Sequence, residues 1–414
     1  MPLLDCLPAV VRAVVCSAAT VSVLAAGSAG AAWGDPARPA GIQAGLATPV
    51  PVGVQFHGMW SMYSDLQRAE VLDKLQAAGV RSVRLDVSWA MLQPVGASSY
   101  DPWGVGFVNR VIGMANARGI KPLVTLWLTP AWANRGQGER VLPDNPADYA
   151  RVARWAGYHW HGKVAGWEVW NEQNSPAFLA GADPVAYTRL LRAAYPAFKK
   201  GDPDSPVVFG GLQYNDTGWI TRAYAAGARG YFDVMATHPY QGVADLAPTT
   251  PDDGTMWRLT HAAAVHRLMA ANGDGGKPIW FTEFGWSTHA TAAGAPNWER
   301  GVSEATQATY LGQTAALVRQ QMPYVTALYW YNDRDLTSGG IQVTNYGLFR
   351  RDMSAKPALA ALATANGRGT VTSALGGSGG AGTGRVGRLA AASAAASTPT
   401  SSQVSMTSTG LRNG

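Results

Sequence analysis

The feature that most constrains this chain is a repeated alternation of short apolar runs with longer segments of helical spacing. The apolar runs are predicted to be strands, because each is only a few residues long and rich in branched and aromatic side chains. A segment whose apolar residues recur at helical intervals follows each run. The expected strands are residues 52–58, 82–89, 121–128, 164–170, 206–212, 232–238, 279–284 and 325–331.

The intervening segments predict helices, with Asp65 and Asp183 as expected N-caps of the first and fourth. Strands that alternate with helices predict an α/β fold with a parallel sheet. Eight such units predict a single (β/α)8 TIM barrel. An open doubly wound sheet would place a glycine-rich phosphate turn after the first strand, where this chain reads F-H-G-M-W. The expected helices are residues 65–78, 103–118, 147–161, 184–200, 219–226, 256–271, 303–321 and 355–365.

The two ends of the chain differ from this pattern. Residues 1–31 resemble a signal peptide, with an apolar stretch at 13–26 and an A-x-A-like cleavage site at 29–31. About 14 apolar residues are too few to span a bilayer. We therefore expect a secreted or cell-surface protein with no stable membrane insertion after cleavage, which would also remove both cysteines, Cys6 and Cys16.

Three further segments complete the predicted organisation. Residues 32–50 are rich in Pro, Gly and Ala and are expected to form a flexible leader, and residues 51–365 form the barrel domain. Residues 366–414 consist mainly of Gly, Ala, Ser and Thr. This tail is expected to be disordered, because it cannot bury enough apolar surface to offset its chain entropy.

The net charge of +6 does not indicate a nucleic-acid partner. Four arginines and no other charged residue lie in the tail, so the barrel itself is close to neutral and has no basic face. The 16 tryptophans suit a protein core, and they also suit a carbohydrate cleft, where a flat ring packs on the apolar face of a sugar.

Two glutamates stand where a barrel carries its catalytic groups, at the carboxyl ends of strands. The fourth strand runs into Asn171 and Glu172, and the seventh carries Glu283 near its end. A single glutamate in such a place is usually solvated or ion-paired. Two of them, each among Asn, His and Trp, favour a catalytic pair in which one protonates a glycosidic oxygen and the other attacks the anomeric carbon or activates water.

Other strand ends supply groups that can hydrogen-bond hydroxyls or stack on sugars. Arg84 and Tyr240 are expected to keep Glu283 ionised, and Glu168 is expected to be a buried partner for Arg84 or another interior polar group. His57 is either a sugar contact or a core hydrogen-bonding group. No cofactor or metal ion is expected, since acid–base and covalent catalysis suffice. The candidate substrate-binding residues are Asn171, Arg84, His57, Trp127, His238, Tyr240, Trp286 and Trp330.

These motifs resemble the clan-A glycoside hydrolases over roughly residues 50–365. The sequences W-N-E at 170–172 and T-E-F-G-W at 282–286 match the two signature sites of the clan. Within the clan the chain is most similar to family 39, also in the run that begins at Asp183, and more loosely to family 5. Three further features of the clan are also present: an arginine on strand two (Arg84), H-x-Y on strand six (His238 and Tyr240) and a tryptophan on strand eight (Trp330).

The resemblance implies a retaining mechanism with Glu172 as general acid/base and Glu283 as nucleophile. Asn171 would contact the sugar 2-hydroxyl, Arg84 and Tyr240 would hold the nucleophile, and Trp330 would form the floor of the central subsite. The clan usually has proline after the acid/base, whereas this chain has Gln173. This departure bears on the loop beside the acid and hence on leaving-group specificity.

The sequence therefore predicts an exported glycosidase that acts on O-glycosidic, β-linked poly- or oligosaccharides. Two alternatives remain open: a non-catalytic carbohydrate-binding barrel, and a transglycosylase that remodels cell-surface glycan. The loops at 129–145 and 241–254 are expected to wall the cleft.

Overall fold

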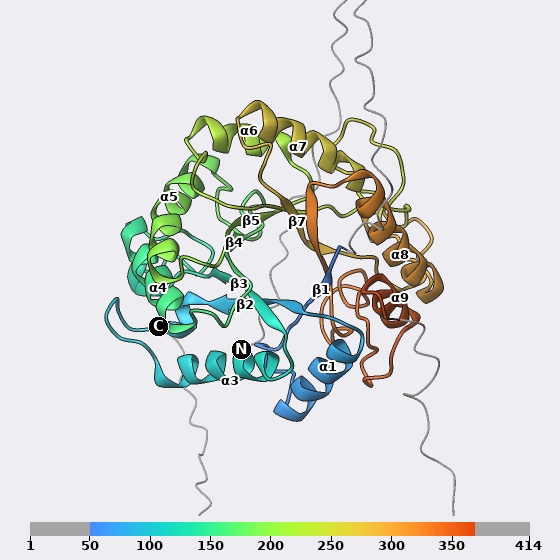
Figure 1. The fold of residues 1–414 in the computed structure, drawn as a ribbon, viewed down its shortest axis with the longest axis horizontal. Helices are drawn as coiled ribbons and strands as arrows, with labels where there is room; N and C mark the ends of the chain where they lie inside the picture. Colours follow the sequence, from blue (N-terminus) through green and yellow to red (C-terminus); the bar gives the residue numbers. More distant parts are fainter. Residues whose placement is uncertain (1–49, 369–414) are drawn as a thin grey trace, which may run out of the picture. The chain divides into compact units, whose positions relative to one another are not determined.

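A computed structural model of the chain describes residues 50–368, and these form a closed barrel of eight strands in chain order (Figure 1). Every neighbouring pair is parallel. The predicted (β/α)8 fold is thus confirmed. The predicted signal peptide and almost all of the predicted leader and tail lie outside the described residues. The strands are β1 Val52–Gln55, β2 Ser82–Ser88, β3 Lys121–Trp127, β4 Gly166–Asn171, β5 Val207–Gln213, β6 Met235–His238, β7 Ile279–Phe284 and β8 Val325–Trp330.

Helices surround the barrel in Figure 1. Their apolar sides and the outward faces of the strands share one continuous core. The α-helices are α1 Asp65–Ala77, α2 Trp89–Leu92, α3 Pro102–Asn116, α4 Pro146–His159, α5 Pro184–Gly201, α6 Thr217–Ala225, α7 Ala262–Ala271, α8 Glu304–Gln321 and α9 Pro357–Ala365; the short 3-10 turns are η1 Ala131–Ala133, η2 Leu259–His261 and η3 Asn297–Glu299. No helix within residues 50–368 has the length and apolar character that crossing a membrane requires.

Helix ends follow local capping chemistry. Asp183 caps α5 as predicted, by accepting the Val185 N–H. The prediction for α1 is one residue off, because Ser64 is the cap: it accepts the Gln67 N–H while the Gln67 side chain accepts the Ser64 N–H. The helix expected from residue 256 begins later, as η2 followed by α7.

The barrel interior has an apolar base and a polar middle. A small cluster at the base is separate from the outer core and contains Leu123, Val208, Val234, Ala236 and Tyr329. One layer further along the strands the inward side chains are Gln55, Arg84, Thr125 and Glu168, all fully buried. This change from apolar to charged lining places a hydrogen-bonded network directly under the carboxyl ends of the strands.

The ordered contacts of the barrel continue past the expected domain end at residue 365. The Asn366 side chain accepts the Val52 N–H at 2.9 Å and donates to the Val52 carbonyl at 3.0 Å. These two bonds pair the backbone N–H and carbonyl of Val52 at the start of β1, so Asn366 belongs with the barrel rather than with the tail.

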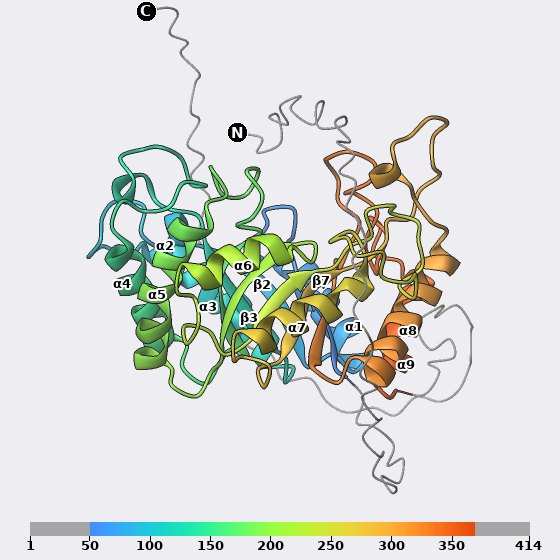
Figure 2. The ribbon, with the colours of Figure 1, turned by 90° about the horizontal axis from the view of Figure 1, so that it is seen from above.

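Figure 2 shows long loops rising at one end of the barrel. They connect β3 to α4, β6 to η2 and β7 to α8. The first two contain the segments that the sequence predicts as cleft walls. In parallel barrels the loops at this end carry the site.

Candidate active site

The backbone is irregular where both glutamates leave their strands. At the end of β4, Trp170 has φ 72° and the next residue but one, Glu172, has φ 45°, values that are rare for residues other than glycine. Trp170 accordingly packs in the outer core and Asn171 contacts Arg84 in the interior, while Glu172 keeps the inward facing of Glu168. In β7, the pairing with β8 shifts register between Phe281 and Phe284. A strictly alternating β7 would point Thr282 inward and Glu283 outward, and a register shift of this kind re-aims a side chain.

Arg84 is the centre of the network beneath the site. Its guanidinium donates to Glu168 at 2.6 Å, to Gln55 at 2.8 Å and to Asn171 at 2.7 Å. A fourth bond reaches Glu283 Oε1 at 2.7 Å. Because these four partners come from β1, β4 and β7, one fully buried arginine fixes the ends of β4 and β7 relative to each other.

Glu283 is held by two donors on separate oxygens. Arg84 contacts Oε1, and the Tyr240 hydroxyl donates to Oε2 at 2.9 Å. Burial raises the pKa of Glu283 to about 7, the Arg84 charge opposes this, and the charge of Asp86 adds to it. Both direct contacts stabilise the ionised form, which is the form a nucleophile needs.

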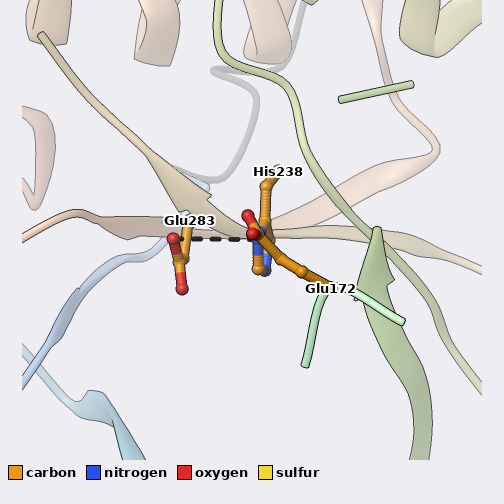
Figure 3. A group of neighbouring side chains, drawn as sticks. All are labelled: Glu172, His238 and Glu283. Atoms are coloured by element: carbon orange, nitrogen blue, oxygen red, sulfur yellow. Dashed lines mark hydrogen bonds and ion pairs between the residues drawn. The ribbon is translucent and has the colours of Figure 1, made fainter. Parts of the chain in front are cut away.

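Glu172 has a different environment. Its side chain lies beside those of His238 and Glu283 (Figure 3), with Oε1 3.0 Å from His238 Nδ1. On the other side of the ring, His238 Nε2 lies 3.1 Å from the Thr282 hydroxyl. Burial, and then the Arg84 charge, holds the pKa of His238 well below its usual range, so this ring is neutral. Burial, and then the charge of Glu283, raises the pKa of Glu172 well above its ordinary value. Glu172 is therefore the better proton donor of the pair.

The two carboxylates are close and nearly enclosed. One oxygen of each lies within 4.8 Å of the other, with His238 Nδ1 in the same group. Glu172 is 6 % exposed and Glu283 8 %. These three side chains are also a place, within residues 50–368, where potential metal ligands converge. The Arg84 guanidinium beside Glu283 opposes a further positive charge there.

Gly211 on β5 makes room for His238. A Cβ at this position would lie 2.1 Å from His238 Nε2 and 2.5 Å from the Thr282 hydroxyl oxygen. We expect Gly211→Ala to lower the free energy of unfolding by about 1–3 kcal/mol and to lower activity, because His238 must move away from Glu172. Urea denaturation and turnover of an aryl glycoside measure the two effects.

Gly113→Ala on α3 is the matched control, since a Cβ there meets nothing within 4 Å. A helix interior favours alanine over glycine, so this control should stabilise the chain by about 0.5–1 kcal/mol without affecting turnover. If Gly211→Ala leaves activity intact, then the position of His238 is not critical for catalysis.

The other predicted site residues differ in how directly they contact this network. Asn171 and Tyr240 are in direct contact with the Arg84–Glu283 network. His57 is buried and stacks on Trp60, with ring centroids 4.0 Å apart. Burial, and then the Arg84 charge, lowers the pKa of His57 to about 3. Trp127 lies half-buried at the end of β3, edge-on to Trp170.

Trp286 and Trp330 do not face the site, which corrects the prediction for both. They pack against each other and against Phe284 in the outer core. Their indole N–H groups donate to the carbonyls of Leu246 and Tyr346. For Trp330 the reason is alternation along β8: Tyr329 points into the barrel, so Trp330 points out and Tyr331 points in again.

Tyr331 is the aromatic residue that the sequence interpretation missed. Its ring lies against His57 (centroids 5.5 Å apart), Tyr240 (6.3 Å) and Tyr346 (5.5 Å). Burial, and then the charge of Glu283, raises its pKa well above the ordinary range. Counting inward positions from Tyr329 would have favoured Tyr331 over Trp330.

The fold and the site define the class: a (β/α)8 barrel with paired buried glutamates from its fourth and seventh strands. A family model described as glycosyl hydrolase family 1 matches residues 62–186. Beta-glucosidase A of Thermotoga maritima is 33% identical over 101 residues, which are 21% of this chain and 22% of that protein. The chain thus matches only about a fifth of the length of this curated relative.

Solved structures share the barrel over most of the described chain. A family 39 glycoside hydrolase from Bacteroides cellulosilyticus WH2 has a TM-score of 0.61 at 23% identity, covering 77% of this chain and 63% of that one. A GH5_18 enzyme from Streptomyces cattleya in complex with Manb1-4GlcNAc has a TM-score of 0.59 at 21% identity, covering 76% and 80%. The chain is therefore similar to the clan-A glycoside hydrolases, as its motifs predict, with family 39 and family 5 among the structures that share its fold.

Proposed function

We propose that the chain is a retaining glycoside hydrolase that cleaves β-linked O-glycosides by double displacement. The observation that carries this proposal is the close approach of two buried carboxylates in unlike surroundings, with oxygens of Glu172 and Glu283 within 4.8 Å. Retaining enzymes have carboxyl groups about 5–5.5 Å apart, whereas inverting enzymes leave about 6.5–9.5 Å for a water molecule.

Each residue then has one role in the first step. Glu172 gives its proton to the glycosidic oxygen while a Glu283 oxygen attacks the anomeric carbon. The bond from that carbon to the leaving oxygen breaks, and the bond to Glu283 forms. Arg84 and Tyr240 aim and stabilise the attacking carboxylate through their contacts of 2.7 and 2.9 Å.

The second step reverses the roles. Glu172, now ionised, takes a proton from water, whose oxygen attacks the anomeric carbon and releases Glu283 as a carboxylate. Substrate linkage is proposed as β, because the curated relative is named a beta-glucosidase and the GH5_18 structure holds a β-linked disaccharide.

The direct test is the anomer first released by the purified full chain. We would offer 4-nitrophenyl β-glucoside, β-mannoside and β-xyloside with the matching β-1,4-disaccharides, and follow products by proton NMR. First release of the β-anomer supports retention, and first release of the α-anomer contradicts it. Sugar binding without turnover anywhere in the panel would instead support a non-catalytic barrel, and predominant transfer products would support a transglycosylase.

The pH dependence of kcat/KM should be bell-shaped. Activity rises as Glu283 ionises near about pH 7 and falls at higher pH, where Glu172, whose pKa is raised well above its ordinary value, loses its proton. The two limbs describe the coupled pair rather than either residue alone. With a 2,4-dinitrophenyl glycoside, whose leaving group needs no proton, Glu172→Gln should lose the alkaline limb. An unchanged alkaline limb in that variant would assign the acid elsewhere.

We also propose that the enzyme is exported. Support comes from the apolar stretch at 13–26 and the small-residue site at 29–31. Expression of the full chain in a bacterial host, followed by N-terminal sequencing of protein outside the cytoplasm, would detect cleavage near residue 31.

A further inference from the structure

A half-buried tyrosine after β5 and an exposed tryptophan in the loop before η2 form an aromatic pair. Trp257 is 42% exposed, and its ring meets that of Tyr214 with centroids 4.4 Å apart and planes at 71°. Neither residue is used in the chemistry above.

Hydrogen bonds hold the backbone at Trp257 and Arg258 in place. The Gly242 N–H donates to the Trp257 carbonyl at 3.0 Å, and the Asn215 side chain donates to the Arg258 carbonyl at 2.9 Å. Gly242 also lacks the Cβ that would lie 2.7 Å from the Trp257 Cβ. The indole is therefore presented by a fixed segment, and binding would order little additional chain.

Tyr214 connects this pair to the acid. Its N–H donates to the His238 carbonyl at 3.0 Å, and the His238 ring lies 3.0 Å from Glu172. Tyr214 has φ 61°, an unfavourable backbone conformation that this bond helps to hold. Burial, and then the charge of Glu172, raises the pKa of its hydroxyl to about 12, so it stays a neutral hydrogen-bond donor.

Position relative to Glu172 decides what this pair can bind. A general acid must lie within hydrogen-bond reach of the oxygen that it protonates, which is the oxygen of the leaving group. Tyr214 adjoins Glu172 through His238 and carries Trp257 against its ring, whereas Arg84 holds Glu283 from beneath. This side of the site is therefore the side on which the leaving group lies.

We propose that Trp257 and Tyr214 form the leaving-group subsite and select a sugar ring as leaving group. The indole face packs on the C–H face of a pyranose, and the tyrosine hydroxyl bonds a sugar hydroxyl. This inference rests on the proposed glycosidase function and adds its substrate class: an oligosaccharide whose leaving group is itself a sugar.

The test compares two substrates with the same transferred sugar, cellobiose and β-glucosyl fluoride, or the mannose pair if the chain prefers mannosides. Fluoride offers the subsite no ring. Trp257→Ala should lower kcat/KM for the disaccharide about 10- to 100-fold, the scale of truncating an aromatic anchor, and change the fluoride by less than about twofold. Trp257→Phe keeps a flat ring and should recover part of the loss.

Trp103→Ala is the matched control, because Trp103 is 68% exposed on α3 and its ring partner is Phe107. It should leave both substrates unchanged. Equal losses on disaccharide and fluoride in Trp257→Ala would overturn the subsite, and so would no loss on either. A wild-type chain that turns over nothing in the aryl-glycoside panel above would instead remove the glycosidase function itself, which keeps the two failures distinct.

Discussion

Glu172→Ala should lose activity in proportion to how much the leaving group needs a proton. For a disaccharide or a methyl glycoside we expect kcat/KM to fall about 10²- to 10⁴-fold, the usual contribution of a general acid. For a 2,4-dinitrophenyl glycoside the first step should be nearly unaffected, because that phenolate departs without protonation. The glycosyl-enzyme then accumulates, since no base activates water.

Added azide separates this explanation from simple damage to the site. As a small anionic nucleophile it needs no base, so it should accelerate turnover of the dinitrophenyl substrate in Glu172→Ala and yield a β-glycosyl azide. Glu283→Ala is the companion variant. It should lose on the order of 10⁴-fold on every substrate, as when one member of a cooperating catalytic unit is removed. Equal losses of Glu172→Ala on good and poor leaving groups would contradict its role as acid.

Arg84→Met should be the most destabilising single change in the barrel interior. It leaves the carboxylates of Glu168 and Glu283 without their shared counter-ion, contacted at 2.6 and 2.7 Å. Removing one partner of a buried ion pair typically costs about 3–5 kcal/mol, because the remaining charge is uncompensated. Catalysis should be lost as well, since Glu283 and Asn171 lose the group that positions them.

The loss in Arg84→Met should depend on pH in a defined direction. Without the guanidinium, the largest influence that opposes the effect of burial on Glu283 is lost, so its pKa in the folded variant rises further above the unfolded value of about 4.3. The folded variant then binds more protons than the unfolded chain, so its stability falls as pH rises. The difference in unfolding free energy from wild type should be smaller at about pH 5 than at about pH 8, measured by urea denaturation.

Arg110→Met provides the comparison. Arg110 pairs with Asp65 at 3.2 Å, but both side chains are about half exposed. Such surface pairs contribute at most about 1 kcal/mol, so this variant should show a small loss with little change between the two pH values. An Arg84→Met protein as stable as Arg110→Met would show that the interior carboxylates are neutral in the native barrel.

Much of the fold could be predicted because its signals are local. Val207–Gln213 and Ile279–Phe284 are short, almost wholly buried strands, and runs of this kind stand out in the sequence. Asp183 followed by proline marks the start of α5 equally well. The capping of α1 by Ser64 was missed because Asp65 is an equally good cap by residue type, and only the backbone decides between neighbours.

The amino-acid sequence by itself determined the strand order, the parallel barrel and the placing of Glu172 and Glu283 at strand ends, because period and chain order carry that information. Only the tertiary structure decided which side chains face the site. The irregularity at Trp170 turns Asn171 inward, the register shift between Phe281 and Phe284 turns Glu283 inward, and regular alternation turns Trp330 out and Tyr331 in. The direction in which a side chain points depends on how its strand pairs with the neighbouring strands, and those strands lie far away in the sequence.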